Sequence, residues 1–359
     1  MKRSAWILIP LLILSSACHG VPPDDPLDQY IRSEMQEHAI PSVCLAVIRE
    51  GAVEKTAAYG TVDLEWDIPA DTGNAHQLAS ATKLLTSTVV MQLVQEKRLD
   101  LNAPISHYLP DLPGSWVQIT LRHLMMHQSG IPMVPITEIA SMEEALAWAM
   151  SRPLEYEPGT KDAYSSADFT VLQHILERVQ QKEWPQILKE RVLEPLGMNS
   201  SGFARVSCDG FIYDSDLIRH RARVFENEGG RVRITAALFP EYMFAAGGLF
   251  STIEDLAKWA VALDNETLLS DEMQQRMIAT EALPDGSMAH FTCGGWVNYP
   301  DTEKLGRTTG HSGGPALADI LRYPDHKLTV IVLCNQQNLL PHLAAGIAEL
   351  ISNPRLNRE

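Results

Sequence analysis

Residues 43–59 have the sequence VCLAVIREGAVEKTAAY, and the fold of the chain can be worked out from this stretch. Val43 to Arg49 is almost entirely apolar, Ala52 to Tyr59 is a second strand-like run, and Glu50-Gly51 between them suits a tight turn. Two such runs on either side of a short turn containing Gly predict a β-hairpin. The strongly apolar first run indicates that this hairpin belongs to a buried sheet.

A partner strand is expected from the other end of the chain. Leu328 to Leu333 is a continuous apolar run typical of a buried strand, and Leu343 to Ile351 has the pattern of a closing helix. Helical patterns fill the sequence between the ends, and one more precedes the hairpin: residues 28–38, 81–96, 121–127, 142–150, 168–181 and about 251–263. The simplest packing is an α+β fold, in which early and late strands share one antiparallel sheet with flanking helices and the central helices form a second lobe.

This division predicts a single domain over residues 24–350. The sheet lobe takes in about residues 24–80 and 290–351, and the mostly helical lobe about residues 81–289. A ligand site is expected in the crevice between the lobes, because ligand sites are concave and favour such boundaries.

Composition narrows the function further. The chain has 359 residues and a formal net charge of −16, with 45% apolar and 21% charged residues. This length supports a large core, and the composition is that of an ordinary globular protein. The acidic balance argues against nucleic acid, which binds clustered Lys and Arg, and against docking on anionic membrane surfaces.

Five cysteines are too few for a scaffold built on disulfides. Cys44 and Cys334 stand in apolar runs and are predicted to be buried thiols, while spacing cannot say whether any disulfide joins Cys44, Cys208, Cys293 and Cys334. No metal site or cofactor is predicted, because there is no CxxC pair and no His/Cys cluster with zinc spacing. His123 and His127 lie one helical turn apart without a Glu between them, and we interpret them as helix surface.

The N-terminus has the parts of a secretory signal. Lys2 and Arg3 precede an apolar run from Ala5 to Leu14, which is followed by Ser15-Ser16-Ala17-Cys18. The run is too short to span a bilayer, and Pro10 argues against the alternative of a buried helix. Residues 1–17 are therefore predicted to be removed on export. Cleavage before Cys18 would leave a cysteine that can carry a lipid, as in bacterial lipoproteins, so the protein is expected in the periplasm, secreted, or attached to a membrane through Cys18.

Three short motifs could carry chemistry, and the first is Ser80-Ala81-Thr82-Lys83. Ser80 stands at the expected start of a helix, and Lys83 emerges one turn later on the same face. A lysine near a serine in a partly desolvated cleft can act as its base. The alternative is an ordinary helix N-cap, because Ser is common there.

The second motif is Tyr164-Ser165-Ser166, between the turn Glu157-Pro158-Gly159-Thr160 and the helix that begins near Asp168. A tyrosine in this loop could transfer protons if neighbouring cations lower the pKa of its phenol. The alternative is that Tyr164 packs and Ser165 caps the helix.

The third motif is Gly310-His311-Ser312-Gly313-Gly314. Its small residues let a substrate lie along the backbone, where an N–H could form an oxyanion hole with the N–H of Ser80. The string also matches Gly-x-Ser-x-Gly, the nucleophile elbow of α/β-hydrolases. An elbow needs an apolar strand before it and a helix after it, whereas here a polar segment precedes and a strand is expected to follow.

In chain order, Ser80-x-x-Lys83, Tyr164-x-Ser166 and His311-x-Gly313 resemble the three motifs of the serine β-lactamase and penicillin-binding superfamily. The surrounding sequence resembles the class C β-lactamase-related serine hydrolases, which include DD-peptidases, D-aminopeptidases and carboxylesterases. The resemblance covers roughly Asp28 to Leu350 and implies a β-lactamase/transpeptidase-like fold. The matching stretches are residues 121–132 (LRHLMMHQSGIP), 157–166 (EPGTKDAYSS), 193–198 (LEPLGM), 246–256 (AGGLFSTIEDL) and 310–314 (GHSGG).

The resemblance also implies roles for these residues. Ser80 would be the acylated nucleophile, Lys83 and Tyr164 together its base, and Tyr164 would later serve the leaving group or the deacylating water. Backbone N–H groups of Ser80 and Gly314 would hold the oxyanion, with Ser166, His311 and Gly313 also at the substrate.

Two departures from the family pattern affect the expected substrate. The second motif usually ends in Asn, and here Ser166 has a hydroxyl that can still bond to Lys83 but reaches less far. The third motif has His311 where class C β-lactamases have Lys, and a histidine is mostly neutral at pH 7. Both departures favour an esterase or D-peptidase/amidase acting on a small ester, amide or peptide over a β-lactamase or DD-carboxypeptidase. A catalytically silent ligand-binding member is the alternative from another class.

Overall fold

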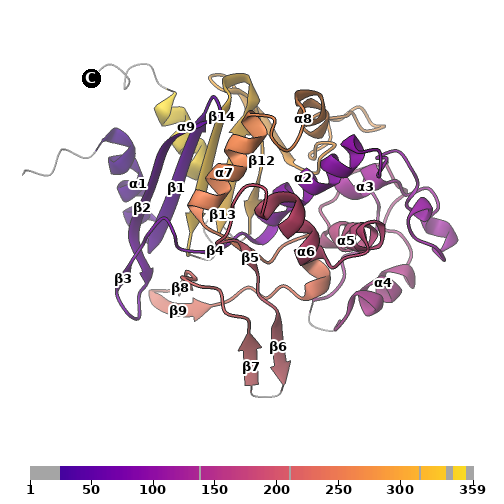
Figure 1. Ribbon diagram of the computed structural model, residues 1–359, viewed down its shortest axis with the longest axis horizontal. Coiled ribbons are helices and arrows are strands. Elements are labelled where there is room, and N and C mark those ends of the chain that lie inside the picture. The colour runs from indigo at the N-terminus through magenta and orange to yellow at the C-terminus, as the bar shows by residue number, and fades with distance from the viewer. Residues whose placement is uncertain (1–24, 137–138, 210–211, 315–316, 337–342, 353–359) are drawn as a thin grey trace, which may run out of the picture.

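The computed structural model describes residues 25–136, 139–209, 212–314, 317–336 and 343–352. Its largest element is a seven-stranded antiparallel sheet in the order β11-β12-β13-β14-β1-β2-β3 (Figure 1). The strands are β1 (Ser42–Arg49), β2 (Ala52–Asp63), β3 (Ile68–Pro69), β11 (Val297–Thr302), β12 (Gly306–Gly313), β13 (Ala318–Tyr323) and β14 (Leu328–Cys334).

The two ends of the sequence meet at the centre of this sheet. β1 and β2 form the predicted hairpin, and β1 also pairs with β14, with Val43 opposite Cys334 and Arg49 opposite Leu328. Because strand residues alternate between faces, Cys44 packs into the core shared with the central helices, whereas Cys334 packs under α1 (Pro26–Glu37) and α9 (Leu343–Ile351). The predicted α+β class, with a sheet built from both chain ends, is confirmed.

The same geometry settles the state of three cysteines. Cys44, Cys293 and Cys334 are buried free thiols, and Cys44 and Cys334 lie on opposite faces of the sheet. Burial raises the pKa of both of these thiols to about 12, so they behave as small apolar side chains. The side chain of Cys208 lies outside the described residues.

The face of the sheet opposite α1 and α9 is covered by helices from the middle of the chain. α7 (Ile253–Asp264) lies against this face (Figure 1). Most helix starts follow local capping signals: Thr120, Ser141, Thr252 and Ser270 each accept a backbone N–H in the first turn. The remaining helices are α2 (Thr82–Gln95), α3 (Leu121–Met125), α4 (Met142–Met150), α5 (Ser166–Gln180), α6 (Trp184–Leu188), the π turn η4 (Lys189–Leu193) and α8 (Asp271–Met277). Of the helices in the described ranges, none combines the length and apolar character needed to cross a bilayer.

The middle of the chain is less helical than the sequence suggested. A small sheet joins β4 (His76–Gln77), β10 (Leu249–Ser251) and β5 (Gly202–Phe203), and two hairpins are formed by β6 (Val206–Asp209) with β7 (Ile212–Ser215) and by β8 (Val224–Glu228) with β9 (Arg231–Thr235). β6 and β7 project from the body of the molecule (Figure 1). The turn of the second hairpin is Gly229-Gly230, with φ of 59° and 84°, a signal that could have predicted it.

Candidate active site

Ser80 is placed by a short strand and a tight turn. β4 runs into the 3₁₀ turn η1 (Ala79–Ala81), and α2 begins immediately afterwards at Thr82. Ala79, the residue before Ser80, has a φ of 44°, a left-handed conformation that is costly for a residue with a Cβ. Backbone strain of this kind tends to be kept where the surrounding structure and the function require it.

Lys83 lies in the first turn of α2 and is only 1% exposed. Its Nζ donates to Tyr164 Oη at 2.8 Å and to the carbonyl oxygen of Ala246 at 2.7 Å. Tyr164 Oη in turn donates to Ser80 Oγ at 2.8 Å. The three side chains that the sequence singled out are therefore joined in one hydrogen-bonded path, with Tyr164 in the middle.

Two aromatic rings lie close to the amine of Lys83. The rings of Tyr164 and Phe169 lie 5.0 and 5.2 Å from its Nζ. None of the ion pairs formed among the described residues includes Lys83. The amine is thus held by a phenol and a carbonyl oxygen, with no carboxylate bound to it.

Ser166 does not make the contact expected of it. It is the first residue of α5, and the hydrogen bonds of Lys83 Nζ go to Tyr164 and Ala246 instead. The Ser166 hydroxyl, which is predicted to be able to bond to Lys83 with a shorter reach than Asn, is not among the hydrogen-bond partners of Lys83 Nζ. Ser165, its neighbour, is the N-cap of the helix and accepts the N–H of Ala167.

His311 and Gly313 stand on the part of β12 that faces η1. β11 pairs with β12 only as far as Gly310, so the strand has a free edge beyond that point. A Cβ at Gly313 would lie 2.0 Å from the carbonyl oxygen of Leu78, which shows how closely β12 approaches the turn that carries Ser80. Gly314 follows in an exposed position with open space around it.

His311 is a buried, neutral imidazole. Its side chain is 4% exposed, and its Nδ1 lies 2.7 Å from the carbonyl oxygen of Ser312. Burial, with a smaller contribution from the Lys83 charge, lowers the pKa of His311 to about 3. At neutral pH this position therefore carries no positive charge.

The alternative interpretation of Gly310–Gly314 as a nucleophile elbow is excluded by this geometry. Ser312 lies within an antiparallel strand, and its hydroxyl donates to Asp319 on the neighbouring strand β13 at 2.9 Å. An elbow serine stands on a sharp turn from a strand into a helix.

Comparison with known proteins identifies the family of the chain. The family model described as Beta-lactamase matches residues 27–350. The chain belongs to the beta-lactamase family. Among curated relatives, it is 24% identical to Protein flp of Staphylococcus aureus (strain N315) over 344 residues, which is 91% of this chain and 66% of that protein. The chain thus spans about two thirds or less of the length of the curated relatives it matches. For Protein flp of strain MW2 the share is 47% of that protein.

Solved structures give the same fold. The octameric penicillin-binding protein homologue from Pyrococcus abyssi superposes with a TM-score of 0.74 and 25% identity, covering 91% of this chain and 77% of that one. The D-amino acid amidase from Ochrobactrum anthropi SV3 superposes with a TM-score of 0.73 and 20% identity, covering 90% and 96%. The expected β-lactamase/transpeptidase-like fold is therefore confirmed.

Several residues of this beta-lactamase family site were not identified from the sequence. Ala246 supplies the carbonyl oxygen that holds Lys83, and it opens one of the stretches that carried the resemblance. His127 is fully buried, so its interpretation as helix surface is wrong. It follows the end of α3 with a φ of 55°, and this backbone turn takes its ring into the interior beside Tyr164. A helical spacing pattern cannot show such a turn.

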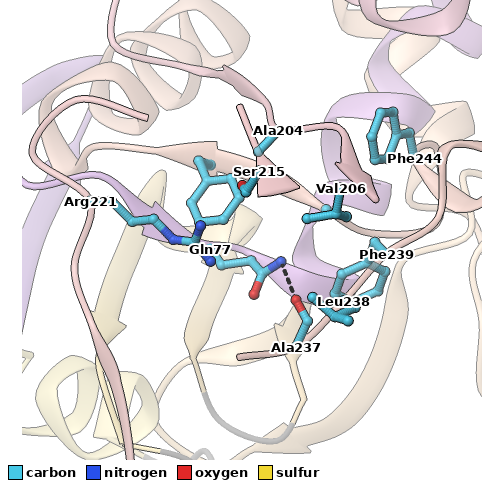
Figure 2. A pocket seen from close by; sticks show the side chains of 11 residues that line it. Gln77, Ala204, Val206, Ser215, Arg221, Ala237, Leu238, Phe239 and Phe244 are labelled. Atoms are coloured by element: carbon cyan, nitrogen blue, oxygen red, sulfur yellow. Dashed lines mark hydrogen bonds between the residues drawn. The ribbon is translucent and has the colours of Figure 1, made fainter. Parts of the chain in front are cut away.

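Gln77, Phe239 and Phe244 are among the residues that line a small pocket next to the strand leading to Ser80 (Figure 2). Gln77, on the strand that leads to Ser80, donates from Nε2 to the carbonyl oxygen of Ala237 at 3.0 Å. A Cβ at Gly247, the residue after Ala246, would lie 2.2 Å from the ring of Phe239. The pocket has a volume of about 10 Å³, room for one water and too little for a substrate group.

Proposed function

We propose that the protein is a serine hydrolase that acts through an acyl-enzyme on Ser80. The observation that carries the proposal is the path from Ser80 Oγ through Tyr164 Oη to Lys83 Nζ, with 2.8 Å at each step. A serine becomes an efficient nucleophile when an adjacent group can take its proton, and this path supplies two such groups in series. Membership of the beta-lactamase family supports the same assignment.

In the first half-reaction Ser80 Oγ forms a bond to the substrate carbonyl carbon while its proton passes to Tyr164 Oη and the phenol proton of Tyr164 passes on to Lys83 Nζ. The carbonyl oxygen becomes an oxyanion, stabilised by the backbone N–H groups of Ser80 and Gly314. The bond to the leaving group then breaks, Tyr164 returns the proton to that group, and an ester remains on Ser80. Water hydrolyses this ester with the same groups accepting its proton, Ser80 regains its hydrogen, and the acid leaves.

The proposed substrates are small uncharged esters first, D-amino-acid amides or peptides second, and β-lactams last. A neutral His311 offers no fixed cation to the carboxylate that β-lactams carry. An ester without a carboxylate loses nothing from this absence. The structural similarity to a D-amino acid amidase supports amides as the second class. β-Lactamase or DD-carboxypeptidase activity is the alternative within the same chemistry.

A silent ligand-binding protein is the competing function, and Ser166 in place of the usual Asn is the observation that favours it. An active-site serine label decides between them. We expect a fluorophosphonate or a fluorescent penicillin to modify the wild type at Ser80, and Ser80→Ala to abolish both labelling and turnover of p-nitrophenyl acetate while the circular dichroism spectrum is unchanged. An alanine variant that keeps wild-type esterase activity would overturn the mechanism.

Export is proposed separately, on the signal-like sequence of residues 1–17, which lie outside the described residues. The mature protein would be periplasmic or secreted, or attached to a membrane by a lipid on Cys18. Intact-mass analysis of the native protein tests this, and a chain that still begins at Met1 would contradict it.

A further inference from the structure

A cluster of three buried polar side chains lies behind Tyr164. Asp168, on α5, is 1% exposed, and it contacts His127 and Ser129, which follow α3 and are 0% and 1% exposed. The composition is that of a Ser-His-Asp triad, but the order is different. In such a triad the histidine lies between serine and acid, whereas here Asp168 lies between Ser129 and His127. The cluster therefore has another role.

The hydrogen-bond pattern favours one placement of the protons. The backbone N–H of Ser165 points at His127 Nδ1 at 3.3 Å, a hydrogen bond that requires an Nδ1 without hydrogen and places the ring proton on Nε2, which is buried without a partner among the described residues. Asp168 Oδ2 lies 3.0 Å from the same Nδ1, and this contact is a hydrogen bond only when the carboxyl group supplies the proton. Ser129 Oγ accepts the N–H of Ile131 at 2.9 Å and donates its own hydrogen to Asp168 Oδ1. Each contact is thus a donor–acceptor pair when Asp168 is a neutral carboxylic acid.

The surroundings agree with this assignment. Burial raises the pKa of Asp168 well above its ordinary value, an effect that the hydrogen bond from Ser129 and the Lys83 charge reduce but do not cancel. Burial, with the nearby Lys83 charge, lowers the pKa of His127 well below its ordinary value. Other titratable groups near the cluster are Asp162, which is bound to His290, His311 on β12, and Tyr156, whose hydroxyl donates to the carbonyl oxygen of His127 at 3.0 Å.

The cluster holds both chain neighbours of Tyr164. Ser165 N donates to the ring of His127, and Ala163 N donates to its carbonyl oxygen at 2.9 Å. The His127 ring also packs against the Tyr164 ring, with 4.7 Å between centroids. The orientation of the His127 ring depends in turn on its bond to Asp168. The position of Tyr164 Oη between Ser80 and Lys83 therefore depends on Asp168, although Asp168 contacts none of these three side chains by a hydrogen bond.

We propose that Asp168 is a positioning residue that works as a neutral acid: its O–H group donates to His127 Nδ1, and His127 fixes the loop that carries Tyr164. The kinetic consequence rests on the proposed function, and the protonation state does not.

Two substitutions separate this role from a merely structural one. Asp168→Asn keeps a donor to His127 and an acceptor for Ser129, so it is expected to retain kcat for p-nitrophenyl acetate within about threefold and the same pH–rate profile. Asp168→Leu can do neither, and it is expected to lower kcat by about 10- to 100-fold with little change in KM, the loss typical of a misplaced catalytic group. An Asn variant as impaired as the Leu variant, or one whose pH–rate profile is displaced, would overturn the proposal.

An infrared difference measurement tests the protonation state without activity and without the Leu variant. Wild type minus Asp168→Asn at neutral pH is expected to show the carbonyl band of a protonated carboxylic acid. Asp255 provides the matched control, since it is 2% exposed and receives the Ser200 N–H at 2.8 Å and Lys258 Nζ at 2.8 Å, as a carboxylate does. Asp255→Asn should leave the band in place. If the wild type lacks the band, the proposal fails, and if the band is present in a protein that hydrolyses no ester, only the proposed function fails.

Discussion

At the scale of single residues, the site is defined by which groups are charged. Lys83 is buried against a phenol and a carbonyl oxygen, and His311 is buried as a neutral ring on the strand facing Ser80. In the proposed mechanism, the first arrangement provides a proton path for acylation, and the second offers no cation to a substrate carboxylate. We therefore expect substrate choice to depend on His311, a side chain that does not take part in the proposed proton path.

His311→Lys tests this dependence. A cation at this position should add a charge-assisted hydrogen bond to the carboxylate of a penicillin, worth about 1–3 kcal/mol. The ratio of kcat/KM for a penicillin to that for p-nitrophenyl acetate is expected to rise by the corresponding 5- to 150-fold. His311→Gln, which stays neutral, is the control and should leave the ratio near that of the wild type. Efficient cephalosporin hydrolysis by the wild type without ester activity would contradict the ranking of substrates.

At the scale of elements, the site depends on the approach of β12 to the turn η1. Gly313 has room for no side chain, because a Cβ there would lie 2.0 Å from the carbonyl oxygen of Leu78. We expect Gly313→Ala to move β12 away from Ser80 and separate the two proposed oxyanion donors, lowering kcat by about 100-fold or more. Gly314→Ala has open space at its Cβ and is the matched control. Steady-state kinetics on p-nitrophenyl acetate measures both, and equal effects would contradict the close-approach argument.

At the scale of the whole molecule, buried histidines make the fold sensitive to acid. Burial lowers the pKa of His76 to about 4, and it lowers those of His311 and His127 as well. An unfolded chain binds protons at these positions below about pH 6.5, where the folded protein does not, so stability falls as the pH falls from 6.5 towards 4. Asp168 has the opposite effect on stability. Its raised pKa means that the folded protein binds a proton at a higher pH than the unfolded chain does, which stabilises the folded protein as the pH falls.

The net effect should be measurable in urea unfolding at pH 7 and pH 5. Each strongly depressed histidine is expected to cost on the order of 2 kcal/mol between these two pH values. His76→Gln should reduce the difference in unfolding free energy between pH 7 and pH 5 by about that amount, because it removes one such histidine. His76 is chosen because it lies outside the proposed catalytic path. An unchanged difference in this variant would show that His76 titrates normally in the folded protein.

The elements that sequence could predict are those whose causes are local. The hairpin at Glu50-Gly51 follows from strand content and turn residues, and the helices after Thr120 and Ser141 follow from a capping side chain close to the first turn. The order of strands and helices then leaves few ways to build one sheet from both ends of the chain. The three motifs could be selected as candidates for the same reason, since each is a short contiguous string within a recognisable family context.

What only the tertiary structure decided are the properties that depend on segments far apart in the chain. The bond between Lys83 and Ala246, the burial of His127 and the neutral state of His311 arise because distant residues exclude water and supply partners. The absence of a hydrogen bond between Ser166 and Lys83 also depends on the relative positions of residues far apart in the sequence. By itself the sequence determined the architecture and singled out Ser80, Lys83 and Tyr164, which meet at the site. Their protonation and contacts were decided by folding, because desolvation and hydrogen bonding are properties of the space around a side chain and not of its neighbours in sequence.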